Sequence, residues 1–255
     1  MAKFFLSFIF FISLLLIFLV TQFFLTIEDA SLPAAGKGME WLLSDISNFN
    51  DPAVAWILKN INDNYCNSDE IEQLISSQLK RYESYPIEKA YIRLFEEGYQ
   101  YSFDYEVLKN FSNTFDDLLI PAIYCDRQEI PDEVLSRIEN YENSYGYELT
   151  HIFLAASFMR DRGCIDGSMI DQMAKKIAFE QNMSDFNDLY AERQSLLLYY
   201  GYEDLVDVSW SEEITSSQQD NGGWYDYKFN LLSENPHTTA LATWALTQQA
   251  NSCPI

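Results

Sequence analysis

The side chains best suited to chemistry are two histidines and three aspartates near the starts of apolar segments. His151 and His237 are the only two histidines of the chain, and Asp116, Asp117 and Asp188 occupy comparable places. A helix N-terminus favours a carboxylate and keeps a histidine neutral. A neutral imidazole beside carboxylates can bind a divalent metal ion or share acid–base work. These five residues are therefore the catalytic candidates, although an aspartate at a helix start is also an ordinary cap worth about 1 kcal/mol.

Aromatic residues precede both histidines in the loops that lead to them. They are Tyr145, Tyr147, Trp224, Tyr225 and Tyr227. Such rings suit stacking on a sugar or an apolar ligand, so we expect them to form a ligand-binding wall. The sequence contains no nucleophile elbow, phosphate-binding glycine loop or H-E-x-x-H motif. We therefore predict no metal site and no cofactor, since a divalent metal ion has no motif to support it.

The elements that position these side chains are predicted to be helices. Strongly apolar segments such as 150–160 alternate with amphipathic ones such as 131–141 and 168–179. A helix that is apolar almost all round must be buried on most sides, whereas an amphipathic helix lies outside it. No stretch shows the period-two alternation of strands. The sequence therefore predicts an all-α fold whose helix pairs repeat about every 40 residues.

The clearest unit of this pattern is the segment 209–249. It places Gln218, Gly222 and Trp224 in a Q-x-x-x-G-x-W arrangement ahead of the apolar helix 236–249. Glycine permits a tight turn between helices. The tryptophan ring can pack over a neighbouring helix end, and the glutamine amide can satisfy free backbone groups there. We therefore expect a structural role for these three residues, with Trp224 also counted in the aromatic wall.

This motif, followed by His237-Thr238-Thr239-Ala240-Leu241-Ala242, resembles the α/α-toroid proteins, which include triterpene cyclases and protein prenyltransferase β-subunits. The close match covers about 40 residues, and the repeat rhythm extends it loosely to about 200. The resemblance implies an α/α toroid of helix-pair repeats, in which the N-termini of the inner helices gather at one mouth of a central cavity. It would place the five catalytic candidates around that mouth.

The catalytic motifs of those enzymes are incomplete in this chain. The nearest matches to the D-x-D-D acid motif of hopene-type cyclases, at 114–117 and 185–188, each lack one carboxylate. His237 stands where the zinc-binding histidine of a prenyltransferase would be, but no matching Asp-x-Cys is present. The resemblance therefore implies a fold and transfers neither activity, because one fold hosts many functions.

The charge of the chain excludes one class of partner. The formal net charge is −23, with 39 acidic and 16 basic residues. So acidic a surface repels phosphate backbones, and we predict no nucleic-acid partner. It either keeps the protein soluble or attracts cations and cationic ligands.

The N-terminus carries a membrane signal. Residues 4–27 follow Lys3 and contain no charged side chain. About 20 apolar residues span a bilayer, whereas the apolar region of a cleaved signal has about 7–15, so the length favours an uncleaved anchor over a secretory signal. The positive end stays in the cytoplasm, which predicts a single-pass protein with the bulk of the chain outside. If the signal is cleaved, the chain is secreted instead.

Four cysteines follow the apolar run: Cys66, Cys125, Cys164 and Cys253. No C-x-x-C pair is present, so a zinc ribbon is excluded. Outside the cytoplasm they can form two disulfides in any of three pairings, or remain buried thiols. The chain is predicted to contain an anchor or signal at 1–30, a linker at 31–37 and a toroid-like domain at 38–255.

Three functions fit this organisation. The first is a membrane-anchored extracytoplasmic domain that binds a carbohydrate, an apolar ligand or another protein, favoured by the anchor and the missing catalytic motifs. The second is a polysaccharide lyase or hydrolase with its site at the inner-helix mouth, favoured by the aromatic residues. The third is a degenerate terpenoid or isoprenoid enzyme, which the incomplete acid motifs disfavour.

Overall fold

The computed structural model describes residues 30–44, 50–110, 115–226 and 234–255, and in these ranges the chain is helical without any strand. This confirms the all-α prediction. A first helix covers residues 30–44. The later α-helices are α2 Pro52–Ile61, α3 Asp69–Tyr82, α4 Pro86–Tyr91, α5 Tyr105–Leu108, α6 Asp116–Ile123, α7 Asp132–Glu139, α8 Tyr147–Asp161, α9 Ile170–Gln181, α10 Asp188–Tyr199, α11 Val208–Ser216 and α12 Pro236–Ala250. Short turns of other helix types are η2 Asn62–Cys66, η3 Ile92–Leu94, η5 Tyr141–Asn143 and η6 Glu203–Leu205.

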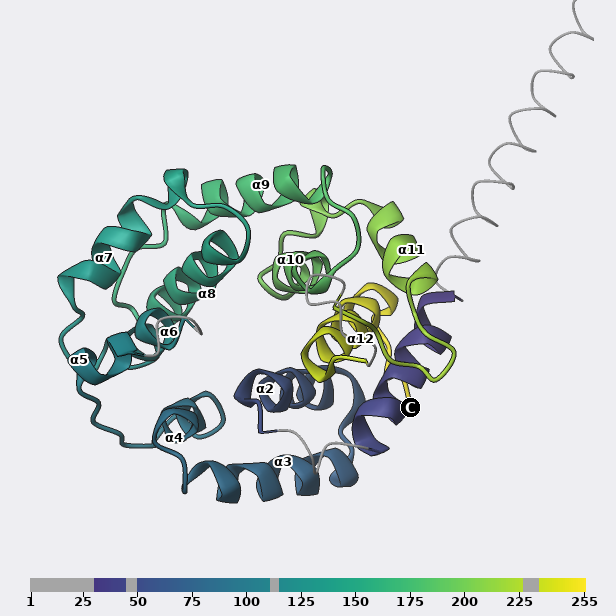
Figure 1. Cartoon of the computed structure of the whole chain (residues 1–255), viewed down its shortest axis with the longest axis horizontal. Helices are drawn as coiled ribbons and strands as arrows, with labels where there is room; N and C mark the ends of the chain where they lie inside the picture. The colour runs from purple at the N-terminus through teal and green to yellow at the C-terminus, as the bar shows by residue number, and fades with distance from the viewer. Residues whose placement is uncertain (1–29, 45–49, 111–114, 227–233) are drawn as a thin grey trace, which may run out of the picture.

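The helices form an inner and an outer layer. Figure 1 shows α3, α5, α7, α9 and α11 around the outside, with α2, α4, α6, α8, α10 and α12 inside them. The helix of residues 30–44, drawn in purple, lies on the outside between α11 and α3. Inner and outer helices thus alternate along the chain, and the last inner helix, α12, packs against both α10 and the first inner helix, α2.

Burial follows from the composition of each layer. All eight residues of the inner helix α6 are buried, whereas the outer helix α7 buries only Val134 and Ile138. The predicted alternation of buried and amphipathic helices is confirmed. It arises because an outer helix needs only one apolar stripe, while an inner helix contacts neighbours on most sides.

Local sequence fixes where two inner helices begin. The Asp51 carboxylate accepts the backbone N–H of Ala53 ahead of Pro52, the first residue of α2. The Asn235 side chain accepts the backbone N–H groups of His237 and Thr238 at the start of α12. A side-chain acceptor at the cap satisfies N–H groups that have no partner in the helix. These caps place Asp51 and His237 at the same end of adjacent helices.

The Q-x-x-x-G-x-W motif has the structural role expected of it. The Gln218 side-chain amide donates to the backbone carbonyls of Ala34 and Gly222, both at 2.8 Å. The Trp224 ring is fully buried and its indole N–H donates to the carbonyl of Ile214 at 2.7 Å. Gly222 has a φ of 96°, a conformation that glycine adopts without steric cost. The motif thus joins α11 and α12 to the first helix.

Two disulfides connect the helix ends. Cys66 bonds to Cys253 and Cys125 bonds to Cys164, so neither a free thiol nor another pairing remains. The first bond links the turn after α2 to the segment after α12, and therefore ties the first inner helix to the last. The second links the C-terminal ends of α6 and α8.

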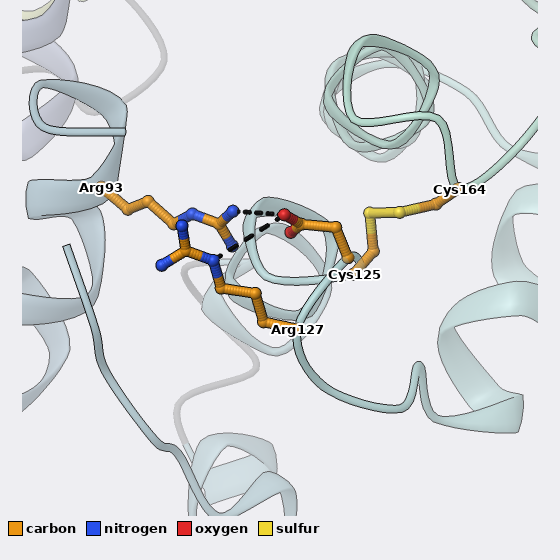
Figure 2. Close-up of a disulfide and its surroundings, with 5 residues drawn as sticks. Arg93, Cys125, Arg127 and Cys164 are labelled. Atoms are coloured by element: carbon orange, nitrogen blue, oxygen red, sulfur yellow. Dashed lines mark hydrogen bonds and ion pairs between the residues drawn. A yellow bond between two sulfur atoms is a disulfide. The ribbon is translucent and has the colours of Figure 1, made fainter. Parts of the chain in front are cut away.

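Two arginines lie beside the second disulfide. Figure 2 shows Arg93 and Arg127 next to Cys125, both directed at the Asp126 carboxylate. Arg93 is buried and also lies over the Tyr124 ring at 4.9 Å. The Arg93 hydrogen bond lowers the pKa of Asp126. The Arg93–Asp126 ion pair holds η3, which follows α4, to the end of α6.

One predicted boundary is wrong. The linker expected at 31–37 belongs to the first helix, in which Ala34 and Ala35 are buried. Helix α4 ends at Tyr91 and is followed by the short 3-10 turn η3. The predicted anchor up to residue 29 lies outside the described residues, and no helix within them is long and apolar enough to cross a membrane.

Candidate functional site

A cavity of about 420 Å³ lies among the inner helices. Its polar lining comes from the N-terminal ends of α2, α4, α6, α8 and α12, and consists of Asn50, Asp51, Glu88, Asp116, His151 and His237. Its apolar lining includes Trp56, Tyr91, Leu119, Leu154 and Phe158. Most of these apolar residues lie about one or two helical turns after the polar ones, so the cavity is polar at the helix starts and apolar further along.

Asp51 and His237, which both line this cavity, form an ion pair. The His237 Nδ1 atom lies 2.9 Å from an Asp51 carboxylate oxygen, and the two side chains are 33% and 36% exposed. Burial lowers the pKa of His237, but the carboxylates of Asp188 and Asp51 outweigh it and raise the pKa to about 10. Burial likewise opposes the ionisation of Asp51, yet its bonds to His237 and to backbone N–H groups lower its pKa overall. The pair is therefore charged at neutral pH.

His151 is held in one orientation by its neighbours. Its Nδ1 atom donates to the carbonyl of Tyr147 at 2.8 Å, and its ring stacks on Phe115 with centroids 4.2 Å apart. Because a carbonyl oxygen only accepts, Nδ1 carries the hydrogen and Nε2 is left for other contacts. Glu192 lies behind the ring, 3.5 Å from Nδ1. Burial raises the pKa of Glu192 against the lowering effect of His151.

Asp116 is fixed by a tyrosine on the neighbouring inner helix. The Tyr91 hydroxyl donates to the Asp116 carboxylate, and both side chains are buried. Burial and then the Asp116 charge raise the pKa of Tyr91 well above its ordinary value. Tyr91 therefore stays protonated and remains the donor in this bond.

The structure gathers three of the five catalytic candidates and separates the other two. Asp116, His151 and His237 line the same cavity. Asp188 is not among the lining residues: its two oxygens accept hydrogen bonds from the hydroxyls of Thr238 at 2.8 Å and Tyr147 at 3.2 Å. It stands behind the cavity and acts on it through the pKa of His237.

Asp117 points to the outer layer instead. Its carboxylate lies 3.1 Å from a guanidinium nitrogen of Arg137 on α7, and it does not line the cavity. Placing it at the mouth was wrong. Adjacent residues on a helix differ by about 100° in direction, so Asp116 and Asp117 cannot both face the same space.

The expected aromatic wall is wrong for Trp224, which is fully buried and cannot contact a ligand. Tyr145 is 67% exposed, and the Lys176 ammonium lies 4.0 Å from its ring centroid. Tyr147 is hydrogen-bonded to Asp188. Neither these tyrosines nor Tyr225 line the cavity, and Tyr227 lies outside the described residues.

Other aromatic rings line the cavity in their place. They are Trp56, Tyr91 and Phe158, from three different inner helices. Trp56 meets Phe158 edge to face, with ring centroids 5.9 Å apart. Each of these three aromatic residues lies in an inner helix whose apolar pattern indicates only burial. Sequence alone therefore does not identify them as residues that line a cavity. Asp51 has a clearer signal, because its cap position at the start of an apolar helix matches that of the candidates.

Among the described residues, no group of three or more His, Cys, Asp or Glu side chains is arranged to hold a metal ion. The ionisable groups of the cavity are instead paired with one another, with the Tyr91 hydroxyl, with the Asn50 amide or with backbone groups. Their arrangement can bind donors and positive charge, and can hold or move protons.

No family model, no curated protein and no solved structure matches this chain. The chemistry of the site is therefore inferred from the residues that line the cavity.

Proposed function

We propose that this chain is a ligand-binding domain of α/α-toroid architecture, held outside the cytoplasm by an N-terminal membrane anchor. The observation that carries the proposal is the cavity of about 420 Å³ to which five inner helices contribute. Ligand pockets of about 300–1,000 Å³ with an apolar lining and a few converging polar groups are typical of small-molecule sites. The ligand of such a cavity combines apolar segments with polar groups.

The alternation of inner and outer helices supports the toroid (Figure 1). So does the contact of α12 with α2, which brings the last inner helix back to the first. The Q-x-x-x-G-x-W motif adds the turn chemistry that the resemblance implies. In this architecture the cavity is the axis of the ring, and the starts of the inner helices form its polar mouth.

The proposed location rests on two features of the chain. Residues 4–27 are apolar and uncharged, and both cysteine pairs form disulfides, which persist in oxidising compartments. Alkaline extraction of membranes tests the anchor. The full chain should stay in the pellet, and a variant with two lysines in place of Leu14 and Leu15 should appear in the supernatant. Release of the unaltered chain by alkali would refute the anchor.

A cavity-filling substitution tests the ligand site. Ala53 lines the cavity, and Ala53→Phe places a ring in it. We would screen the full chain in detergent against small molecules by the rise in melting temperature. Ligands that stabilise the wild type should lose that effect in Ala53→Phe and keep it in Ser76→Phe, an exposed control on α3. Equal stabilisation of both variants would refute the site.

One observation favours an enzyme as the second candidate. Asp51 and Asp116 face the same cavity as His151, and a pair of carboxylates is what hydrolysis of a glycosidic bond requires. If the wild type degrades a polysaccharide and both Asp51→Asn and Asp116→Asn lose that activity, the chain is an enzyme rather than a binding domain. The degenerate terpenoid enzyme has less support, because Asp117 is paired with Arg137 and leaves one carboxylate of that motif facing the cavity.

A further inference from the structure

A second cavity adjoins the first. It has a volume of about 560 Å³ and lies between the start of α4, the segment 101–104 and α5. Ile87, Glu88 and Asp116 line both cavities, so the two spaces meet at these three side chains. The segment that borders the second cavity is anchored, since the Tyr101 hydroxyl donates to the carbonyl of Pro86 at 2.7 Å.

Carboxylates line the first cavity, the junction of the two cavities and the second cavity. Asp51 lines only the first cavity, Glu88 and Asp116 line both, and Asp104 lines only the second. No lysine or arginine is present among the described residues that line either cavity. The His237 imidazolium is already paired with Asp51. The lining as a whole is therefore negative.

The polar atoms of the lining are mostly acceptors. Carboxylates accept hydrogen bonds and cannot donate them. The Asn50 amide donates to a Glu88 carboxylate oxygen at 3.0 Å. A ligand that enters this space therefore meets mainly carboxylate acceptors, which N–H or O–H donors match.

Apolar side chains separate these acceptors. Ile87 lies at the junction, with Trp56 and Leu119 in the first cavity and Phe103 and Val107 in the second. A matching ligand carries positive donors at intervals, joined by apolar segments. An ammonium group supplies three N–H donors and a charge, and methylene segments contact apolar and aromatic surfaces.

We propose that the two cavities are consecutive subsites for an elongated aliphatic polyamine. Its ammonium groups bind near Asp51, at Glu88 and Asp116, and at Asp104, and its methylene segments lie against the intervening apolar side chains. This inference rests on the proposed ligand-binding function and names the ligand class. A sugar chain fits less well, since it needs donors from the protein as well as acceptors.

Calorimetric titration of the full chain in detergent tests the charge and the length of the ligand. The probes are spermine, 1,4-diaminobutane and uncharged tetraethylene glycol. Spermine should bind at least about tenfold more tightly than 1,4-diaminobutane, which fills one cavity, because its two further amino groups reach the carboxylates of the second cavity. Tetraethylene glycol should not bind, and added salt should weaken spermine binding. Equal binding of tetraethylene glycol and spermine would overturn the proposal.

Three variants locate the contacts. Glu88→Gln keeps an acceptor for Asn50, and Asp104→Asn keeps a capping side chain for α5. Each should raise the Kd of spermine about fivefold, and Asp104→Asn should leave diaminobutane unchanged. Glu72→Gln removes the same charge from the exposed face of α3 and should have no effect. A loss in Glu72→Gln equal to that in Glu88→Gln would overturn the site, since bulk charge would then explain binding.

The outcome also separates this inference from the proposed function. If ligands of another class stabilise the chain and lose that effect in Ala53→Phe, the central cavity is a binding site but polyamine is the wrong class. If spermine and every other ligand bind equally to Ala53→Phe and the wild type, both proposals are wrong.

Discussion

Removing the disulfide between Cys66 and Cys253 should destabilise the fold more than removing the other disulfide. The bond joins residues 187 positions apart, whereas Cys125 and Cys164 are 39 apart. A crosslink limits the freedom of the unfolded chain, and its effect grows with the logarithm of the loop length. For these loops the chain-entropy relation gives about 5.3 and about 3.9 kcal/mol. The expected difference is about 1.4 kcal/mol.

The assay is urea denaturation of two double variants under non-reducing conditions, so that each keeps its remaining disulfide. Cys66→Ser with Cys253→Ser removes the crosslink between the segments that follow α2 and α12. Cys125→Ser with Cys164→Ser is the matched control, because it also replaces two half-buried sulfur atoms by hydroxyl groups. A free energy of unfolding that is equal in the two variants, or lower in the control, would refute the loop-closure reasoning.

Three further predictions concern pairs and packing. Wild-type stability should fall as the pH rises from about 6.5 to about 10, because the Asp188 and Asp51 carboxylates outweigh burial and raise the pKa of His237 from 6.5 to about 10. The stabilisation is fully present below 6.5, where His237 is protonated in the folded and the unfolded chain, and is lost as the pH approaches the folded-state pKa. Gly222→Ala should cost about 1–2 kcal/mol from its positive φ alone, and its Cβ would also lie 2.5 Å from the Lys37 carbonyl oxygen. Trp224→Ala should cost about 3–5 kcal/mol as a buried ring is removed.

Each of these predictions has a control. His237→Gln should show a flatter stability profile over the same pH range, and a profile as steep as the wild type would contradict the assignment. Gly98→Ala should be close to neutral, since a Cβ there meets nothing within 4 Å. Trp224→Phe should be destabilised less than Trp224→Ala, because phenylalanine still fills the site with a ring. It should still be less stable than the wild type, because it cannot donate the N–H hydrogen bond to the Ile214 carbonyl. Chemical denaturation measures all of them.

The inner and outer helical layers can be predicted from sequence, because the burial of a helix determines the spacing of its apolar residues. Segment 150–160 is apolar almost all round, and it lies within the inner helix α8. Segment 31–37 is a counterexample, because its small residues resemble a linker. In the structure they permit close packing instead: a Cβ on Gly36 would lie 2.7 Å from the Pro254 carbonyl oxygen. Sequence alone does not distinguish small residues in a linker from small residues at a tight helix contact.

The candidate site was only half predictable. The repeat placed Asp116, His151 and His237 correctly at the starts of inner helices. The sequence around Asp51 indicates only a helix cap ahead of Pro52, since its partner His237 is 186 positions away and their contact depends on the packing of α12 against α2. Asp117 was misplaced because helix rotation decides which of two adjacent carboxylates faces inward. The local sequence pattern therefore predicts where the inner helices begin. It does not predict contacts between distant residues or which side of a helix faces the cavity.

The most direct test of the central claim is a crystal structure of the full chain grown with saturating spermine. The account predicts continuous ligand density from the Asp51–His237 pair, past Glu88, to Asp104. An empty cavity, or density only on the outer surface of the molecule, would contradict it.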